Sequence, residues 1–450
     1  MPRALTGNAL YYIGIAWRSI FRDKWLSGLM VLALAVGIGA CMTTTTVFHI
    51  LSGDPLPGRS QHIFYVQVDG DPQHATAKAP WDVLDYRTAK DLAGTAPAGR
   101  YALIASSSAL IARTEEVTQP LQGHFLATNH GFFQMFGPPL AYGRAWTEDD
   151  EVHRARVAVI SHEANQQLFG GGDSTGKTIQ VGDVGYRIVG VLAEWRPRPL
   201  FYEVAGGALM RDSASTFFGK LEDVLIPFDT AVEQHGKLFN PWYCWRQPGE
   251  NESLTQSQGC LWVQLWVWLG DPAAQAVFDH RLSGYAAEQR SLGRFDVTPH
   301  TRLMSLMDWL SYNGVVPDAV RLQLGMAYCF LFICLCNAVG LLFAKFAGRE
   351  HEFALRRALG ATRGAILAQC LVEATMVAIL GGIAGAGVSS LGLMLVRRQP
   401  FSYADLAHID LPMLALLGVI SLACGALVAL VPASRAAAVP PAAQLRGGAA

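Results

Sequence analysis

Four stretches of the chain are apolar over a longer distance than an ordinary soluble helix. They cover residues 25–51, 322–346, 365–396 and 411–431, and few charged side chains interrupt them. A helix needs about 20 apolar residues to cross a bilayer, and uninterrupted runs above about 18 residues indicate membrane helices. The pattern therefore predicts an α-helical membrane protein with four transmembrane helices.

The long stretch between the first two spans has a different pattern. Residues 52–321 mix polar and apolar positions, and short alternating runs bounded by Gly and Pro, such as residues 179–189, are typical of strands. Helical patterns lie between these runs. We expect this stretch to form one large mixed α+β domain.

Lys and Arg residues predict the orientation of the spans. Basic residues next to a span favour the cytoplasmic side. They concentrate in the segment before span one, between spans two and three, and after span four, which are residues 1–24, 347–364 and 432–450. Both termini are therefore expected in the cytoplasm, and residues 52–321 and 397–410 outside it. Arg397 and Arg398 depart from the rule, and we expect them to reach lipid head groups.

The segment before the first span, residues 1–24, has its own periodicity. Apolar residues recur at helical spacing, with Arg18 and Arg22 on the opposite side. This pattern predicts an amphipathic helix lying in the membrane interface, in contact with lipids. The apolar positions are Leu10, Ile13, Gly14, Trp17, Ile20 and Phe21.

Composition agrees with a membrane protein. Apolar residues make up 51% of the chain and charged residues 16%, below the roughly 25% of an average soluble protein. The net charge of -1 gives no overall field that attracts nucleic acid, so no nucleic-acid partner is expected. The eight Cys include no zinc-type CxxC pair, and no HExxH or G-x-S-x-G motif occurs. We expect neither a metal site nor catalytic residues in this chain.

One motif tests that expectation. "GGDSTGKT", residues 171–178, fits the phosphate-binding pattern G-x-x-x-x-G-K-[ST]. That loop binds phosphates only between a preceding strand and a following helix. Here a polar helical pattern precedes the motif, and a hairpin pattern turning at residues 182–185 follows it. We interpret the motif as a Gly-rich turn.

Two cysteines and a Trp-rich segment lie in the second half of the large domain. Cys244 and Cys260 enclose a polar loop, and an oxidising compartment would permit a disulfide between them; two free thiols are the alternative. The stretch from residue 239 to residue 270 then continues into "CLWVQLWVWLG", which is apolar on both faces of a strand. A strand buried on both sides is the first interpretation, and an exposed binding patch is the second.

The charged stretch after span two carries a family resemblance. It reads "EFALRRALGA" over residues 352–361, and "VEA" follows at residues 372–374. This string resembles the second half of MacB/FtsX-type ABC transporter permeases, as does the "PASRAAAVPPAAQLR" of residues 432–446. Residues 130–192 resemble the periplasmic core domain of MacB, and the Gly-rich turn belongs to that family's own sequence there. The Trp-rich stretch of residues 239–270 does not match the family.

The resemblance implies a permease without catalytic activity of its own. This chain has no nucleotide-binding domain, so ATP and Mg would be bound by a separate cytoplasmic ABC ATPase, and the chain itself would carry no cofactor. The other implied partners are a second permease copy or paralogue in a dimer and a periplasmic adaptor protein. The implied location is the bacterial inner membrane, and the implied function is export of a drug, peptide or lipid-like substrate. An FtsX-like regulator of a cell-wall hydrolase and a lipoprotein-releasing permease are the alternatives.

The resemblance also implies a coupling helix between spans two and three. We expect span two to continue into it as one helix, with Phe353, Leu355 and Leu359 as the face that docks on the ATPase. Gly360 is expected to end this helix, and Thr362 to cap the next one. The residues assigned to coupling are Glu350, Glu352, Phe353, Leu355, Arg356, Arg357, Leu359, Gly360 and Ala361.

Span three carries two further features. Gly381, Gly382 and Gly385 have the spacing that lets membrane helices approach closely, within one subunit or at a dimer seam. Glu373 is an ionisable residue inside the span, and such residues often mark a function. Near the inner face, however, it could also reach water or pair with Arg363.

Overall fold

The fold is taken from a computed structural model of the chain. It describes residues 2–77, 79–97, 99–113, 116–205, 216–250, 252–295, 297, 299–399 and 403–438, without the side chains of residues 2–11, 116–119, 216, 437 and 438. The predicted tail 432–450, the predicted loop 397–410 and the side chain of Leu10 thus lie partly or wholly outside the described residues. The chain divides into two compact units, Met1–Ser52 with Val316–Ala450 (unit 1) and Gly53–Val315 (unit 2).

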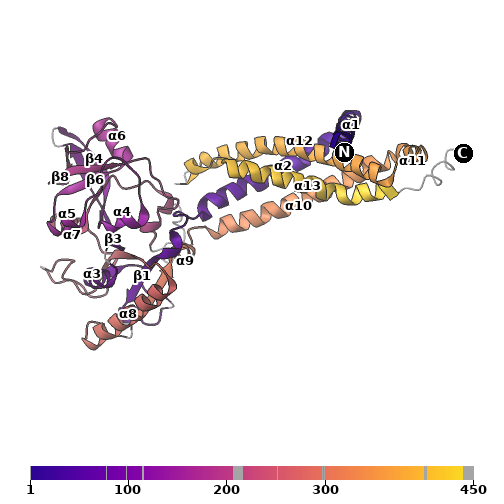
Figure 1. Cartoon of the computed structure of the whole chain (residues 1–450). Coiled ribbons are helices and arrows are strands. Elements are labelled where there is room, and N and C mark those ends of the chain that lie inside the picture. The colour runs from indigo at the N-terminus through magenta and orange to yellow at the C-terminus, as the bar shows by residue number, and fades with distance from the viewer. Residues whose placement is uncertain are drawn as a thin grey trace. The chain divides into compact units, whose positions relative to one another are not determined.

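Unit 1 is helical (Figure 1). Within its described residues, four helices are long and apolar enough to cross a membrane. They are α2 (Lys24–Ser52), α10 (Asp318–Ala347), α12 (Arg363–Arg397) and α13 (Leu411–Ala438). The shorter helices are α1 (Pro2–Arg22), α11 (Glu350–Ala358) and the 3-10 turn η6 (Ala404–Leu406). Each span extends beyond its predicted bounds by one to several residues.

Small residues let these helices pack closely. A Cβ atom at Gly381 would lie 2.8 Å from Cβ of Leu34 on α2, and one at Gly385 would lie 3.2 Å from the carbonyl oxygen of Ala35. Gly382 faces Ser421 on α13 instead. The three glycines therefore lie at contacts of α12 with α2 and α13 inside one chain.

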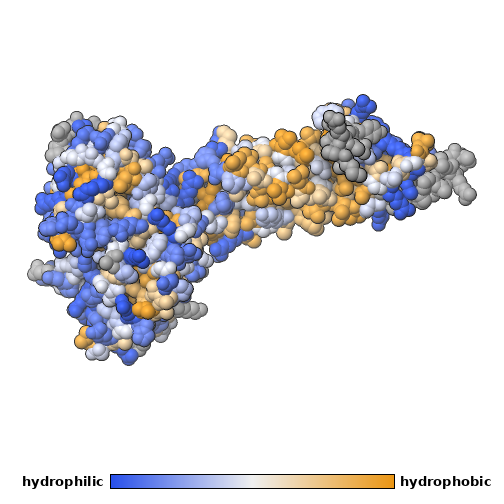
Figure 2. Space-filling view, viewed as in Figure 1, coloured by the Kyte–Doolittle hydropathy of each residue, from blue (hydrophilic) through white to orange (hydrophobic). Residues whose placement is uncertain are grey.

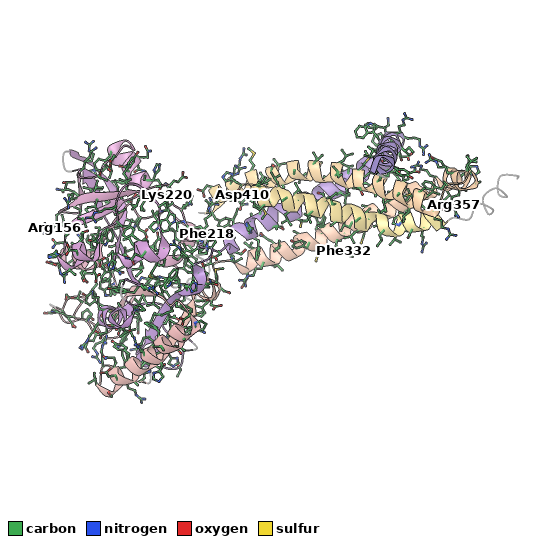
Figure 3. All side chains as sticks on the ribbon, in the orientation of Figure 1. Arg156, Phe218, Lys220, Phe332, Arg357 and Asp410 are labelled. Atoms are coloured by element: carbon green, nitrogen blue, oxygen red, sulfur yellow. A yellow bond between two sulfur atoms is a disulfide. The ribbon has the colours of Figure 1, made fainter. Side chains whose placement is uncertain are left out.

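The outer surface of unit 1 is divided by polarity. Figure 2 shows hydrophobic residues along the middle of the bundle and hydrophilic residues at the end that carries α11. Exposed apolar side chains include Phe332 on α10, labelled in Figure 3, and Trp17, Phe21 and Trp25 at the N-terminal end. A band of this kind suits contact with lipid.

Unit 2 contains one sheet to which all twelve strands of its described residues belong. The strand order along the main path is β12-β1-β11-β3-β4-β9-β6-β8-β5. The strands are β1 (Ile63–Asp69), β2 (Leu84–Asp85), β3 (Tyr101–Arg113), β4 (Glu116–Thr128), β5 (Leu140–Gly143), β6 (Val157–Ile160), β7 (Thr178–Val181), β8 (Val184–Leu192), β9 (Val224–Pro227), β10 (Tyr243–Cys244), β11 (Cys260–Trp268) and β12 (His300–Ser305). Most pairs are antiparallel, and β4 with β9 and β6 with β8 are parallel.

Helices and short turns complete unit 2. The α-helices are α3 (Tyr86–Thr95), α4 (Gly131–Phe136), α5 (Glu148–Val152), α6 (His162–Phe169), α7 (Phe228–His235), α8 (Pro272–Ser291) and α9 (Leu306–Tyr312). The 3-10 turns are η1 (Ser60–His62), η2 (Pro72–His74), η3 (Phe201–Glu203), η4 (Thr216–Phe218) and η5 (Gly236–Leu238). One large apolar core lies on the sheet, with Val263, Leu265 and Phe125 among its buried members.

The Trp-rich strand β11 lies inside the sheet. It pairs with β1 and β3, and its residues are buried up to Val267, with Trp268 half-buried. Trp266 packs edge-on against Tyr65, with ring centroids 4.8 Å apart. The first interpretation, a strand buried on both faces, is confirmed, and the exposed binding patch is wrong, because the side chains on both faces are buried up to Val267.

The Gly-rich turn has the predicted context. Helix α6 precedes it, ending at Gly170 in the left-handed conformation, and strand β7 follows it. Strands β7 and β8 form the predicted hairpin, with Val181 paired to Val184. The order is helix, loop, strand, the reverse of a phosphate-binding loop.

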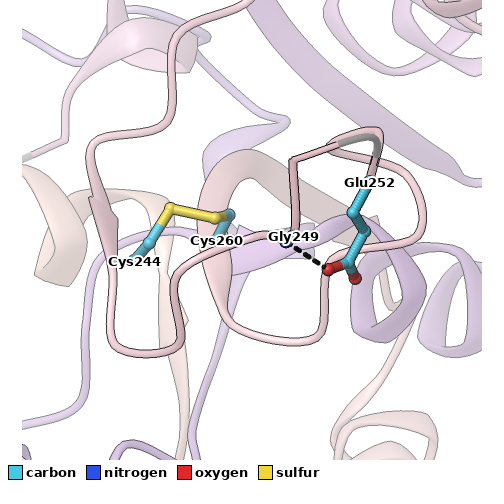
Figure 4. Close-up of a disulfide and its surroundings, with 4 residues drawn as sticks. All are labelled: Cys244, Gly249, Glu252 and Cys260. Atoms are coloured by element: carbon cyan, nitrogen blue, oxygen red, sulfur yellow. Dashed lines mark hydrogen bonds between the residues drawn. A yellow bond between two sulfur atoms is a disulfide. The ribbon is translucent and has the colours of Figure 1, made fainter.

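The structure joins Cys244 and Cys260 in a disulfide (Figure 4). The two residues also face each other as partners of β10 and β11. In the loop that they enclose, the Gly249 N–H donates a hydrogen bond to Oε2 of Glu252 at 3.0 Å.

Candidate coupling site between the second and third membrane helices

Helix α11 is separate from the membrane helix that precedes it. Helix α10 ends at Ala347, and α11 begins at Glu350. Between them, Arg349 leaves the helical conformation, with φ -119° and ψ 12°. The prediction of one continuous helix is therefore wrong. The break turns the Arg349 side chain inward, where it binds two carboxylates described below.

The far end of α11 is closed as the sequence predicts. Gly360 has φ +102°, a conformation that few other residues adopt, and the Ala361 N–H bonds to the Arg356 carbonyl at 3.0 Å. Oγ1 of Thr362 accepts a hydrogen bond from the Ala365 N–H at 3.2 Å and caps α12. Helix α11 is thus a short element bounded by a turn at each end.

The two sides of α11 differ in exposure. Phe353 is fully buried, with its ring 6.1 Å from that of Phe346, whereas Leu355 and Leu359 are 51% and 81% exposed. The assignment of Phe353 to the docking face is wrong. Residues two apart on a helix point about 200° apart, so Phe353 and Leu355 cannot share a face, whereas Leu355 and Leu359 can. We call Leu355 and Leu359 the outer face of α11.

The remaining coupling residues lie around this outer face. Glu350, Glu352, Arg356, Arg357 and Ala361 are half-buried, and Gly360 is exposed. Figure 3 labels Arg357 near the end of the bundle that carries α11. The site therefore has an exposed apolar face with a partly buried charged margin.

A buried carboxylate lies at the centre of the unit 1 polar contacts. Glu373 of α12 is 1% exposed. Its Oε1 lies 2.7 Å from Nζ of Lys345 on α10 and accepts a hydrogen bond from Oγ of Ser19 on α1 at 2.6 Å. Its Oε2 accepts a hydrogen bond from Nη1 of Arg349 at 3.0 Å. Neither predicted alternative for Glu373, water or Arg363, is what the structure shows.

Arg349 continues the contacts from Glu373 to α11. Its Nε donates to Oε2 of Glu352 at 3.1 Å, while its Nη1 also donates to Ser19 at 2.8 Å. One guanidinium thus binds a carboxylate of α12 and a carboxylate of α11 at once. A planar group with several fixed donors is suited to such bridging.

Glu352 extends the contacts further. Nη2 of Arg356 donates to its Oε1 at 2.7 Å, and Nη2 of Arg22 on α1 donates to its Oε2 at 3.2 Å. Burial alone would raise the pKa of Glu352, but its hydrogen bonds with Arg349 and Arg22 and the nearby charge of Arg356 hold the pKa below its usual value. Nη1 of Arg356 also donates to Oε1 of Gln369 on α12 at 2.6 Å.

We call these contacts the unit 1 ion network. Its members are Ser19, Arg22, Lys345, Arg349, Glu352, Arg356, Gln369 and Glu373. They come from α1, α10, α11, α12 and the α10–α11 link. Moving these charged groups out of water costs free energy, which their mutual attraction offsets. Removal of one partner therefore leaves a buried charge uncompensated. Its geometry ties the position of α11 to three other helices.

Sequence reasoning missed several members of the network. The sequence identifies Lys345 and Arg349 only as basic residues beside a span, and nothing in it predicts that Ser19 contacts a carboxylate. The available signal was a carboxylate inside an apolar span, which requires a cationic partner. That rule indicates that a partner exists, but the fold decides which one.

The structure and its sites define a multi-pass membrane protein with a large extracytoplasmic domain and a short charged helix between its second and third spans. The MacB-like periplasmic core domain model matches residues 27–283, and the FtsX-like permease C-terminal model matches residues 324–441. The first range includes the Trp-rich stretch of residues 239–270, so the prediction that this stretch departs from the family is wrong. The chain therefore belongs to the family of ABC transporter permeases with a MacB-like periplasmic core domain and an FtsX-like C-terminal part.

Relatives with similar sequences carry related names. The chain is 21% identical over 402 residues to the uncharacterized ABC transporter permease YknZ of Bacillus subtilis, covering 86% of this chain and 87% of that protein. It is 23% identical to the pyoverdine export ATP-binding/permease protein PvdT of Pseudomonas entomophila, over 97% of this chain and 60% of that protein. It is also 23% identical to the macrolide export ATP-binding/permease protein MacB of Neisseria meningitidis, with 75% and 45% covered. The chain thus matches only 60% and 45% of the lengths of these PvdT and MacB proteins.

Solved structures give matches of low overall score. The periplasmic region of MacB from Actinobacillus actinomycetemcomitans matches 57% of this chain and 93% of its own, with a TM-score of 0.35 and 15% identity. The extracellular domain of YknZ matches 53% of this chain and 99% of its own, with a TM-score of 0.33 and 14% identity.

Proposed function

We propose that this chain is the permease subunit of an ABC transporter whose ATPase is a separate polypeptide. ATP and Mg would bind to that ATPase in the cytoplasm, where we also place both termini and α11. The outer face of α11, Leu355 and Leu359, would dock in a groove of the ATPase. Two such complexes, or one with a paralogous permease, would form the working dimer.

The unit 1 ion network is the observation that carries this proposal. A helix that receives force must be fixed to what it moves. Arg349 and Glu352 fix α11 to Glu373 of α12, and Lys345 fixes Glu373 to α10. A displacement of α11 would therefore reach the spans directly. The spans would carry it to the extracytoplasmic domain, so no substrate needs to pass through the bundle itself.

The names of the relatives support an exported substrate. PvdT and MacB are named as export proteins for pyoverdine and macrolides. We propose a drug, peptide or lipid-like molecule as the class of substrate here, with a periplasmic adaptor protein as a further partner in the bacterial inner membrane. The exposed apolar residues Trp17 and Phe21 of α1 would contact membrane lipid.

The test is a purification of the tagged chain from its native host, followed by identification of co-eluting subunits and assay of ATP hydrolysis. We expect an ABC ATPase to co-elute, and the double variant Leu355→Asp with Leu359→Asp to lose it. The matched control is Phe332→Leu, which lies on the apolar surface of α10. Co-elution of a cell-wall hydrolase with the ATPase would favour the FtsX-like regulator, and co-elution of the ATPase with the Asp variant would overturn the docking face.

A further inference from the structure

A pocket in unit 2 gathers four acidic side chains. Its volume is about 470 Å³, and residues from β3, β4, α6, η3 and the segment before β9 line it. Its charged and titratable residues are Glu163, Glu203, Glu222, Asp223, Lys220 and His124. Among the described residues that line the pocket, four carboxylates thus accompany a single ammonium group, that of Lys220.

Glu222 is the buried member of this group. It is 3% exposed, and its Oε2 accepts a hydrogen bond from the Tyr202 hydroxyl at 3.0 Å. Its Oε1 is buried without a hydrogen-bond partner in the part of the chain that the structure describes. A buried carboxylate in that condition is costly unless it takes up a proton or binds a cation.

The surroundings of Glu222 disfavour its ionised form. Burial, and then the neighbouring carboxylate of Glu203, raise the pKa of Glu222 well above its usual value. The neighbouring Asp223 accepts a hydrogen bond at its Oδ2 from the backbone N–H of His124 at 3.0 Å. Lys220, labelled in Figure 3, also lines the pocket but is exposed, and it is not among the groups that shift the pKa of Glu222.

The dimensions of the pocket point to an organic ligand. A volume of about 470 Å³ falls within the roughly 300–1,000 Å³ of small-molecule sites and far exceeds the space of one ion. Among the described residues, no group of three His, Cys, Asp or Glu is arranged to hold a metal. Leu121, Leu200 and Leu221 add apolar surface to the lining, which suits an alkyl chain.

We propose that this pocket binds an organic cation, with an ammonium or guanidinium group that donates hydrogen bonds to Glu222 and an alkyl part that contacts the leucines. The cation replaces the missing counter-charge, and a charged donor to a carboxylate forms a strong hydrogen bond. The site is independent of α11 and of the ATPase, so its test and the test of the transporter function can fail separately.

The experiment is isothermal titration calorimetry, in which a probe is titrated into the full chain held in phosphatidylcholine nanodiscs. Cadaverine is the probe for a free diamine, and Nα-acetyl-lysine amide is the probe for a peptide lysine. We expect saturable binding of at least one probe, with release of a proton as Glu222 ionises. The affinity then rises with pH, because protons compete with the cation at Glu222, whose pKa lies well above its usual value. Binding of only one probe identifies the source of the cation.

Variants decide whether Glu222 is the site. Glu222→Gln keeps the size of the side chain and removes its charge, so we expect at least about tenfold weaker binding. Glu203→Gln, at a half-buried position, is the second variant if Glu222→Gln folds poorly. We expect it to bind the probe about threefold to tenfold more weakly than the original chain. Glu288→Gln removes an exposed carboxylate of α8 and is expected to bind like the original chain.

Three results would overturn the proposal. The first is unchanged binding in a folded Glu222→Gln chain or, if that variant folds poorly, in the Glu203→Gln chain. The second is displacement of the probes by Mg²⁺ or Ca²⁺ at concentrations below those of the probes, which would make the pocket a metal site. The third is the absence of saturable heat with either probe.

Discussion

Oε1 of Glu373 on α12 lies 2.7 Å from Nζ of Lys345 on α10, and both side chains are 1% exposed. Without Glu373, α10 would carry the Lys345 charge into the bundle with no carboxylate partner among the described residues. The pair therefore fixes the relative position of two membrane helices. Arg349 adds a second cation to the same carboxylate and extends the link to α11.

Removal of the Glu373 charge should destabilise unit 1. In Glu373→Gln, Lys345 and Arg349 lose a shared counter-ion, and breaking a buried pair in this way costs about 3–5 kcal/mol of unfolding free energy. Thermal unfolding of the chain in detergent would measure it. Asp318→Asn is the control, since that side chain is 98% exposed, and its effect should stay within about 0.5 kcal/mol. Equal effects of the two variants would contradict the described network.

The sequence predicts the spans well because length and apolar character determine them locally. It could not predict the ion network, because Ser19 and Glu373 are 354 positions apart and meet only after the helices pack. The prediction of the docking face was wrong for Phe353 for a related reason. The sequence does not distinguish Phe353 from an exposed apolar residue, whereas in the structure it belongs to the apolar core of unit 1 and packs against Phe346 and Arg349. The acidic pocket of unit 2 likewise joins residues from separate elements.

Replacement of Arg349 by Lys separates coupling from folding. Lys keeps the charge near Glu373 but cannot bind Glu373 and Glu352 at once with a planar group. We expect Arg349→Lys to fold and bind the ATPase, with ATP hydrolysis no longer stimulated by substrate. Arg398→Lys, at the residue that follows α12, is the control, because Arg398 is not a member of the unit 1 ion network. Normal stimulation in Arg349→Lys would show that the bridge is not needed for coupling.

Hydrophobic replacement of the network should restore stability without restoring coupling. The triple variant Lys345→Met, Arg349→Met and Glu373→Met removes the buried charges together, and such replacements are often neutral or stabilising by about 1–4 kcal/mol. Unfolding measurements would then show a chain as stable as the original, while substrate-stimulated ATP hydrolysis is lost. A triple variant that is stable and fully stimulated would contradict a coupling role.

Larger side chains at the packed glycines of α12 should disturb the bundle. Gly381→Leu forces atoms toward Leu34 on α2, and overpacking of this kind typically costs about 1–3 kcal/mol. Gly387 on the same helix has no atom within 4 Å of an added Cβ, so Gly387→Leu is a matched control that should have little effect. Unfolding in detergent compares the two. Similar losses would mean that α12 does not pack on α2 through Gly381.

The disulfide should stabilise unit 2. Cys244 and Cys260 are 16 positions apart, and closing a loop of about 15 residues contributes about 3 kcal/mol. Cys244→Ala should therefore lower the unfolding free energy of the chain by about that amount, whereas Cys329→Ala, at an exposed free cysteine, should not. An unchanged unfolding profile in Cys244→Ala would argue against the bond.

The pH dependence of one local contact has a definite sign. The hydrogen bond from His130 Nδ1 to Oε2 of Glu151, at 2.8 Å, raises the pKa of His130 above its ordinary value of 6.5. A raised folded-state pKa gives stability that is fully present below 6.5 and lost as the pH rises through the folded value. Hydrogen exchange at α4, corrected for intrinsic pH effects, should therefore quicken with rising pH. Glu151→Gln should remove most of this dependence, and an unaltered profile would count against the ion pair.

The sidedness of α11 is the central claim, since an ATPase can act on it only from the cytoplasm. The measurement is labelling of intact cells with a membrane-impermeant maleimide, in a chain whose exposed Cys329 and Cys336 are replaced by Ser. Leu359→Cys should remain unlabelled until the cells are opened, while Asp279→Cys on α8 should react at once wherever the reagent reaches unit 2. Labelling of both cysteines in intact cells would place α11 on the same side as unit 2 and contradict the account.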